Sequence, residues 1–320
     1  MSFTPQSRTW TGKRAVLLVH GIGNSRPGDY ADLLHSVETL LGPSHVDVAL
    51  YQLFYDHIND WFVQKTDASA LLGQATAALA QQIDDPEIGA TIAGYIGDIL
   101  WPVLSTSARG AVREAYLAQL KQMVLDGENA GVPVRRQQLT IIAHSLGCFH
   151  TYEALHHAAK YSSHILQPST HEVRFANVIY VASPVQLIRT VAERLGSLVP
   201  NRRWLETVQG DTLHIPFETR DDGKQIQSVR NWVSITGNLD PVGGHFFRKR
   251  ADWAYMQVDG QHSFIDQQFP TDVTSKADLI ARLRTSKLTG DAPTISPRDP
   301  HAWGAYIERH TADLRDWILA

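Results

Sequence analysis

The stretch that decides the fold runs from Gln138 to Gly147 and reads Gln-Leu-Thr-Ile-Ile-Ala-His-Ser-Leu-Gly. Its first six residues form a nearly continuous apolar run, which is typical of a central strand buried on both faces of a parallel sheet. A helix is predicted behind it, from Cys148 to about Lys160. Ser145 therefore lies on a sharp turn between a strand and a helix.

A strand-to-helix turn this sharp needs small residues two positions before and two positions after its central residue, since larger side chains would collide across the turn. Gly147 meets that need, and Ala143 stands where glycine is more usual. We expect Ser145 to be an exposed nucleophile, with the backbone N–H of Leu146 donating to a developing oxyanion. The alternative interpretation is a serine that only caps the helix.

Apolar runs predict further strands on both sides of this turn, at residues 15–19, 46–54, 173–181, 231–236 and 254–258. Helices are predicted at residues 30–41 and at about 302–319. Alternation of strands and helices indicates an α/β fold with a mostly parallel central sheet flanked by helices.

Four of these strands end in a small or polar residue: Gly21, Ser145, Ser183 and Asp240. The carboxyl ends of parallel strands meet at one edge of the sheet, and that edge is where such folds bind ligands. We therefore expect a single site built from all four strand ends, within one domain that spans residues 1–320.

Two long connections interrupt the alternation. Residues 56–136 are too many for one crossover helix, and they predict a helical insertion with helices at about 68–83, 87–103 and 108–126, placed to act as a lid. Within it, Trp61 and Trp101 either line the wall for an acyl chain or pack the insertion on the sheet. A second insertion, at 196–230, contains a predicted β-hairpin.

A serine nucleophile needs a base to remove its proton and a carboxylate to hold the imidazole of that base. Asp240 follows the 231–236 strand and precedes a proline, and the order Ser, Asp, His fits the predicted architecture. An aspartate in an ordinary turn is the alternative. For the base, His301 before the last helix is preferred to His262, which directly follows the predicted 254–258 strand, whereas His245 is too close to Asp240.

The segment His20-Gly21-Ile22-Gly23 follows the first strand. It does not fit a dinucleotide fingerprint, because the third glycine position is Arg26, nor a phosphate loop, because Asp29 follows Gly28. It does fit an oxyanion loop beside Ser145. The N–H of Ile22 would then pair with that of Leu146, with Gly23 contacting substrate.

Four motifs together resemble the α/β-hydrolase superfamily: the His-Gly loop at residues 20–23, Ala143–Gly147, Ala182-Ser183-Pro184-Val185 and Asp240-Pro241-Val242. The nearest resemblance is to intracellular lipases and serine esterases, including the PGAP1-like deacylases. It implies a carboxylic-ester hydrolase with a Ser-His-Asp triad, an acyl-enzyme and no cofactor. A histidine placed before the last helix with a tyrosine nearby, as in that family, favours His301 with Tyr306. A thioesterase or amidase, or a non-catalytic binding module, is the alternative.

Composition limits the partners. Lys and Arg total 29 against 33 Asp and Glu, a formal charge of −4, so the chain has no basic excess for nucleic acid. The longest apolar stretch, 88–104, contains Asp98 and Pro102, which argues against stable membrane insertion and leaves peripheral contact open. We expect a cytoplasmic protein acting on a small-molecule or lipid-like ester, with its oligomeric state undetermined.

The single cysteine and the histidines outside the predicted site are expected to be structural. Cys148, the single cysteine, excludes an intramolecular disulfide and is expected to be buried packing, as is His144. Histidines 150, 156 and 157 lie in one predicted helix, and we expect them on its exposed surface rather than at a metal.

Overall fold

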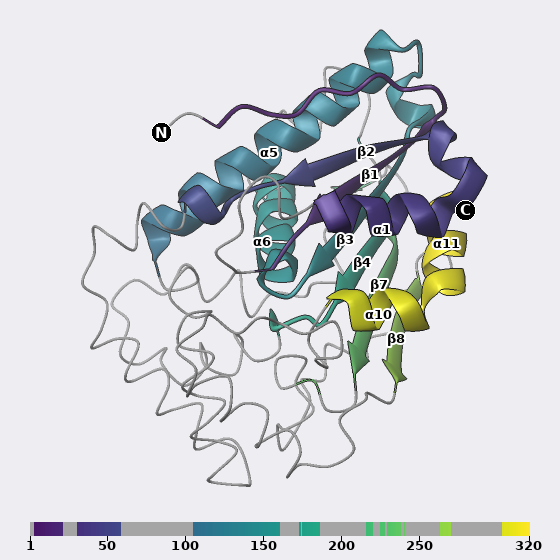
Figure 1. Ribbon diagram of the computed structural model, residues 1–320. Helices are drawn as coiled ribbons and strands as arrows, with labels where there is room; N and C mark the ends of the chain where they lie inside the picture. The colour runs from purple at the N-terminus through teal and green to yellow at the C-terminus, as the bar shows by residue number, and fades with distance from the viewer. Residues whose placement is uncertain are drawn as a thin grey trace, which may run out of the picture.

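A computed structural model describes residues 3–21, 31–58, 105–160, 173, 175–185, 216–219, 225–227, 229–237, 240, 263–269 and 303–320. Its main sheet has six strands in the order β2-β1-β3-β4-β7-β8, and every neighbouring pair is parallel (Figure 1). The strands are β1 (Arg14–Val19), β2 (Val48–Leu53), β3 (Gln138–His144), β4 (Phe175–Val181), β7 (Val229–Gly237) and β8 (Ser263–Phe269).

Helices cover both faces of this sheet (Figure 1). On one face lie α5 (Thr106–Asn129) and α6 (Leu146–Lys160), and on the other lie α1 (Ala31–Leu41), α10 (Trp303–Arg309) and α11 (Thr311–Leu319). The fold class predicted from the sequence, a mostly parallel central sheet flanked by helices, is confirmed. None of the described helices has both the length and the apolar character that crossing a membrane requires.

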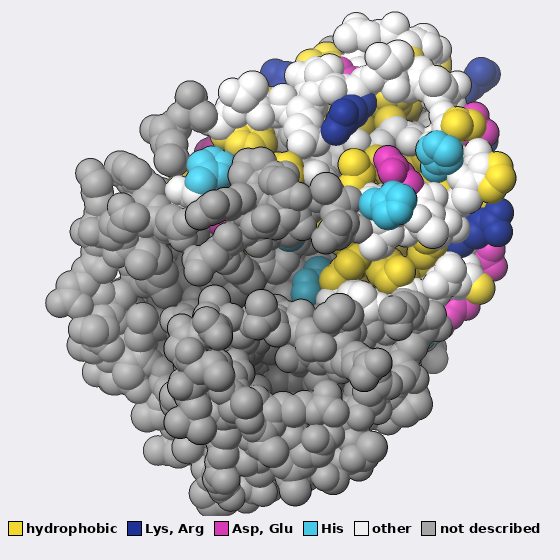
Figure 2. Space-filling view, in the orientation of Figure 1, with side chains coloured by type: hydrophobic (Ala, Val, Ile, Leu, Met, Phe, Trp, Pro, Cys, Tyr) yellow, Lys and Arg dark blue, Asp and Glu magenta, His cyan; other side chains and the backbone are white. Residues whose placement is uncertain are grey.

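The strands are apolar throughout because both faces are buried. Val16 and Leu18 of β1 belong to a hydrophobic cluster with Val37 of α1 and Leu314 of α11. Leu17, between them in sequence, points to the other face and is buried as well. Figure 2 shows apolar side chains gathered between α1 and α10 on the face that carries the cluster.

The helix α5 uses one face to pack on the sheet. Its buried residues Val112, Tyr116, Leu120 and Met123 recur at three- and four-residue steps, and the Tyr116 hydroxyl lies 2.8 Å from the Thr151 hydroxyl of α6. This part of the predicted 56–136 insertion therefore forms a layer of the fold. The other predicted helices, with Trp61 and Trp101, lie outside the described residues.

Three further elements differ from expectation. A short 3-10 helix at Gly42–Asp47, with proline in its first turn, delays the second strand to Val48. The predicted last helix is two helices, α10 and α11, separated at His310. The edge strand β8 was not predicted, because its polar residues obscure the apolar pattern of a buried strand.

Two predictions meet the described part of the chain only in part. The strand predicted at 254–258 lies outside the described residues. Within the predicted 196–230 insertion, β5 (Pro216–Thr219) and β6 (Gln225–Gln227) form an antiparallel pair, as the predicted hairpin requires.

Candidate active site

Ser145 occupies a strained turn between β3 and α6. Its φ is 51°, in the left-handed region, where a side chain costs about 1–3 kcal/mol. A serine held in this conformation between a strand and a helix is the geometry of a nucleophile elbow. The predicted turn is thus present in the backbone, although Ser145 is 3% exposed rather than exposed at the sheet edge.

Glycine is required at position 147, for a reason that differs from the predicted one. A Cβ on Gly147 would lie 2.7 Å from the carbonyl oxygen of Val19 and closer still to that of His20. The collision would therefore be with the end of β1, and not across the turn itself. Gly147 lets the first turn of α6 approach the backbone of the neighbouring strand.

Glycine is required at position 21 as well. A Cβ on Gly21 would lie 2.8 Å from the Cβ of Ser145 and 3.3 Å from its Oγ. The start of the predicted oxyanion loop therefore packs directly on the serine, which accounts for the burial of Ser145. Ile22 and Gly23 lie outside the described residues, whereas Leu146 is the first residue of α6, where helix N–H groups lack intrahelical acceptors.

The expected convergence of strand ends at one edge is confirmed. Backbone bonds extend the ladder beyond the strands: the N–H of Ser145 donates to Val181 O at 2.9 Å, and the N–H of Ala182 donates to Ile235 O at 3.0 Å. Ala182 also has a positive φ, of 54°. Asp240 follows the end of β7 by three residues. The catalytic roles of Ser145 and Asp240 stay predictions.

The carboxylate of Asp240 is fully buried. It accepts a hydrogen bond on Oδ2 from the hydroxyl of Tyr306 in α10. Burial raises the pKa of the Cys148 thiol, and the negative charge of Asp240 raises it further. Cys148 is fully buried and donates to Ala143 O at 3.1 Å, so its predicted role in packing is confirmed.

The two candidate bases, His301 and His262, both lie outside the described residues, but their described neighbours occupy opposite ends of the sheet. Two residues after His301, Trp303 opens α10, and its ring packs edge-on against the ring of His144 with centroids 5.9 Å apart. Ser263, which follows His262, pairs with Asn231 near the start of β7, at the amino end of the parallel strands. His262 thus directly precedes β8, and the predicted 254–258 strand that it was expected to follow lies outside the described residues.

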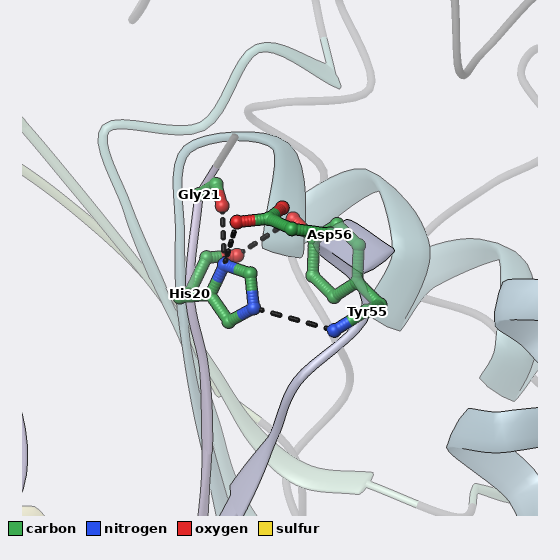
Figure 3. Close-up of polar contacts among 4 residues, drawn as sticks. All are labelled: His20, Gly21, Tyr55 and Asp56. Carbon is green, nitrogen blue, oxygen red and sulfur yellow. Dashed lines mark hydrogen bonds and ion pairs between the residues drawn. The ribbon is translucent and has the colours of Figure 1, made fainter. Parts of the chain in front are cut away.

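The buried side chain of His20 forms a hydrogen bond with Gly21, at the start of the predicted oxyanion loop (Figure 3). His20 donates from Nδ1 to Gly21 O and accepts on Nε2 from the N–H of Tyr55 at 3.4 Å. Its ring stacks on that of Tyr55, 4.3 Å away, and the Tyr55 hydroxyl donates to His20 O at 2.8 Å. Burial lowers the pKa of His20 to about 4, so the ring is neutral near pH 7 although Asp56 Oδ2 lies 3.8 Å from Nδ1.

Tyr55 and Asp56 were not among the predicted site residues. They follow β2, whose carboxyl end lies at the same edge as the ends of β1 and β3. Extending the strand-end argument to β2 would have identified both. Their contacts with His20 arise from the pairing of β1 with β2, which brings together segments 35 residues apart in sequence.

His150 corrects another expectation. It is buried, 1% exposed, and its ring packs against those of Tyr55 and Phe149, so it does not lie on an exposed helix surface. Burial lowers its pKa to about 3, and neither ring nitrogen has a hydrogen-bond partner among the described residues. Within the described ranges, no group of three or more His, Cys, Asp or Glu is arranged to hold a metal ion.

Comparisons with known proteins give distant likenesses. No known family of sequences and no curated protein matches the chain. Esterase B from Lactobacillus rhamnosis is similar over 98% of this chain and 79% of its own, at 11% identity and a TM-score of 0.41. A hyperthermophilic esterase from Pyrobaculum calidifontis is similar over 98% of this chain and 80% of its own, at 10% identity and a TM-score of 0.37. A lidless serine hydrolase from Xanthomonas campestris is similar over 88% of this chain and 84% of its own, at 13% identity and a TM-score of 0.29.

Proposed function

We propose that this protein is a serine hydrolase of carboxylic esters. The observation that carries the proposal is the strained Ser145, set between β3 and α6 at the edge where Asp240 lies buried. A Cβ-bearing residue adopts this conformation at a cost, and strain of this kind is concentrated at functional sites. A serine that only capped the helix would lie in extended backbone, without that cost.

The proposed reaction uses two half-steps. The Ser145 Oγ attacks the acyl carbon while the base removes its proton, and the amides of Ile22 and Leu146 donate to the oxyanion. The carbonyl re-forms, the bond to the alcohol breaks, and the base passes its proton to the departing alkoxide. Water then attacks the acyl-enzyme by the same route, releasing the acid and restoring Ser145. No cofactor enters either step.

Topology supports His301 as the base. The chain leaves β8 after Phe269, at the carboxyl edge of the sheet, and His301 lies between that point and α10. Trp303 and Tyr306 of α10 contact the end of β3 and Asp240. A residue just before β8, such as His262, is by contrast adjacent to the amino edge of the sheet. The amino edge lies about 20 Å from the carboxyl edge, given a rise of roughly 3.3 Å per residue along the strand.

A fluorophosphonate probe tests the proposal directly. We expect it to label wild-type protein at Ser145 and to leave Ser145→Ala unlabelled, with hydrolysis of p-nitrophenyl esters lost in the same variant. His301→Ala is expected to abolish turnover, and His262→Ala to retain it. Absence of labelling in folded wild-type protein would indicate a binding module instead. If the probe labels Ser145 but thioesters or anilides are cleaved faster than esters, Ser145 is still the nucleophile and the substrate is a thioester or an amide.

Substrate length tests the predicted wall. If Trp61 and Trp101 contact an acyl chain, alanine at either position reduces activity on eight-carbon esters more than on two-carbon esters. Gly23 is, like Trp61 and Trp101, a predicted substrate contact. Equal losses on both esters would assign the tryptophans to packing of the insertion.

A further inference from the structure

We infer that Tyr306 is a positioning residue for Asp240, through which the C-terminal helix α10 fixes the carboxylate of the triad. The inference rests on the proposed function and extends it to a residue outside the triad. Its basis is the hydrogen bond from the Tyr306 hydroxyl to Asp240 Oδ2, between two fully buried side chains 66 residues apart in sequence.

The phenol is held by the core and not by the site. Tyr306 belongs to the hydrophobic cluster that also contains Ile235 of β7 and Leu314 and Ile318 of α11. Close packing restricts the ring to one orientation, so its hydroxyl offers a fixed point of attachment. Ile235 comes from the same strand that leads to Asp240, which ties donor and acceptor to one rigid unit.

One such bond suits a triad carboxylate. A buried carboxylate is costly unless donors compensate its charge, and its two oxygens accept about four hydrogen bonds in all. A bond on Oδ2 fixes the plane of the carboxylate and leaves acceptor capacity for an imidazole N–H. Catalysis by this group depends on orientation, because the carboxylate holds the tautomer of the base.

The bond also alters the charge that the base experiences. A phenol that donates to the carboxylate draws negative charge toward itself. Loss of that donor concentrates the charge on the carboxylate oxygens, which stabilises the imidazolium form of the base. The apparent pKa of the base in a pH–rate profile is therefore expected to rise when the hydroxyl is removed.

A purely structural role is the competing explanation, since any buried tyrosine hydroxyl needs a partner. The chain offers a matched pair for comparison. Tyr51 is also fully buried, and its hydroxyl donates to a carboxylate oxygen, Asp126 Oδ2, at 2.8 Å. Tyr51 lies in the middle of β2, the edge strand farthest from β7 and β8. Both bonds stabilise the fold, but only the bond to Asp240 is expected to affect catalysis.

The experiment compares Tyr306→Phe with Tyr51→Phe, measuring kcat, KM and the pH dependence of kcat/KM on a short p-nitrophenyl ester, with Tm recorded for each. A hydrogen bond to a charged group corresponds to about a tenfold to hundredfold effect on rate. We expect Tyr306→Phe to lower kcat by that factor with little change in KM, and to move the acidic limb of the profile to higher pH. Tyr51→Phe is expected to lower Tm alone.

A second variant covers the case in which Tyr306→Phe does not fold. Fluorotyrosine at position 306 keeps the ring and makes the hydroxyl a stronger donor, so the acidic limb is expected to move to lower pH. The inference is overturned if the acidic limb of the pH profile does not move in Tyr306→Phe or in the fluorotyrosine variant while Asp240→Asn loses most of its activity. The hydrolase proposal stands in that case. Failure of the proposed function has a different signature, which is wild-type protein without fluorophosphonate labelling.

Discussion

At the scale of single residues, Ser145 has a backbone conformation that costs stability. A side chain in the left-handed region is strained by contact between its Cβ and the backbone, and glycine is not. Ser145 keeps φ at 51° between a buried strand and a helix whose close approach is fixed by Gly147. The surrounding packing therefore imposes this conformation on the serine.

This strain gives a stability prediction. Ser145→Gly is expected to be about 1 kcal/mol more stable than Ser145→Ala, because only alanine retains the strained Cβ. Both variants lack the hydroxyl of the proposed nucleophile, so the comparison is independent of activity. Urea unfolding at pH 7.5 measures the difference.

The control is Ala143→Gly, two residues earlier in the extended backbone of β3. It is expected to be destabilised, since glycine in a strand loses more conformational freedom on folding and buries less surface. If Ser145→Gly proved less stable than Ser145→Ala, the turn would not be strained.

At the scale of elements, the candidate site depends on the close approach of β1, the segment that follows β1, and the turn from Ser145 into α6. The first turn of α6 lies against the end of β1 at Gly147, and the segment after β1 lies against Ser145 at Gly21. His20 and Tyr55 hold that segment from behind through bonds to Gly21 O and His20 O (Figure 3). These contacts fix the start of the predicted oxyanion loop relative to the elbow.

The close approach predicts the effect of one methyl group. In Gly21→Ala the new Cβ meets the Cβ of Ser145 at 2.8 Å, so the loop or the serine must shift. Displacements of about 1 Å at a reacting centre cost about a hundredfold in rate. We expect a loss of that size in fluorophosphonate labelling, measured as a second-order rate constant.

Gly110→Ala is the matched control for Gly21→Ala. Gly110 lies within α5, and the nearest atom to its added Cβ is an Arg113 side-chain nitrogen at 3.8 Å, an ordinary contact. Alanine is expected to stabilise the helix by about 0.5–1 kcal/mol and to leave labelling unchanged. Full labelling of Gly21→Ala would show that the loop accommodates the methyl group.

At the scale of the whole molecule, buried neutral histidines make stability depend on pH. Burial lowers the pKa of His20 to about 4 and that of His150 to about 3, both from 6.5. Below pH 6.5 the unfolded chain binds protons at these sites while the folded protein does not, so stability falls as pH falls toward 4. A shift of this size corresponds to about 3 kcal/mol for His20.

His150→Phe isolates one part of this effect. The ring packs between aromatic neighbours and its nitrogens are unbonded among the described residues, so phenylalanine is expected to preserve stability at pH 7.5. Between pH 7.5 and 4.5 the variant should lose less stability than wild type, as measured by urea midpoints. An identical pH dependence in both proteins would remove His150 as a contributor.

Much of the architecture followed from the sequence because local patterns carry it. Apolar runs followed by small or polar residues predicted β1, β3, β4 and β7, and the small residues around Ser145 predicted the turn. Elements with mixed polarity were harder to predict. The strand β8 combines Asp266 and two glutamines with apolar residues, and only its pairing with β7 makes it a strand. The break at His310 was likewise absent from the apolar spacing, which continues through it.

By itself the sequence determined the fold class, the strand-to-helix turn at Ser145 and the edge of the sheet at which the strands that lead to Ser145 and Asp240 end, since strand periodicity and strand ends are local properties of the chain. Only the tertiary structure decided the contacts between distant segments. These are the bond from Tyr306 to Asp240, the support of Gly21 by His20 and Tyr55, and the burial of Ser145 and His150. The physical reason is that burial and hydrogen bonding depend on which side chains packing brings together, and sequence spacing leaves that choice open.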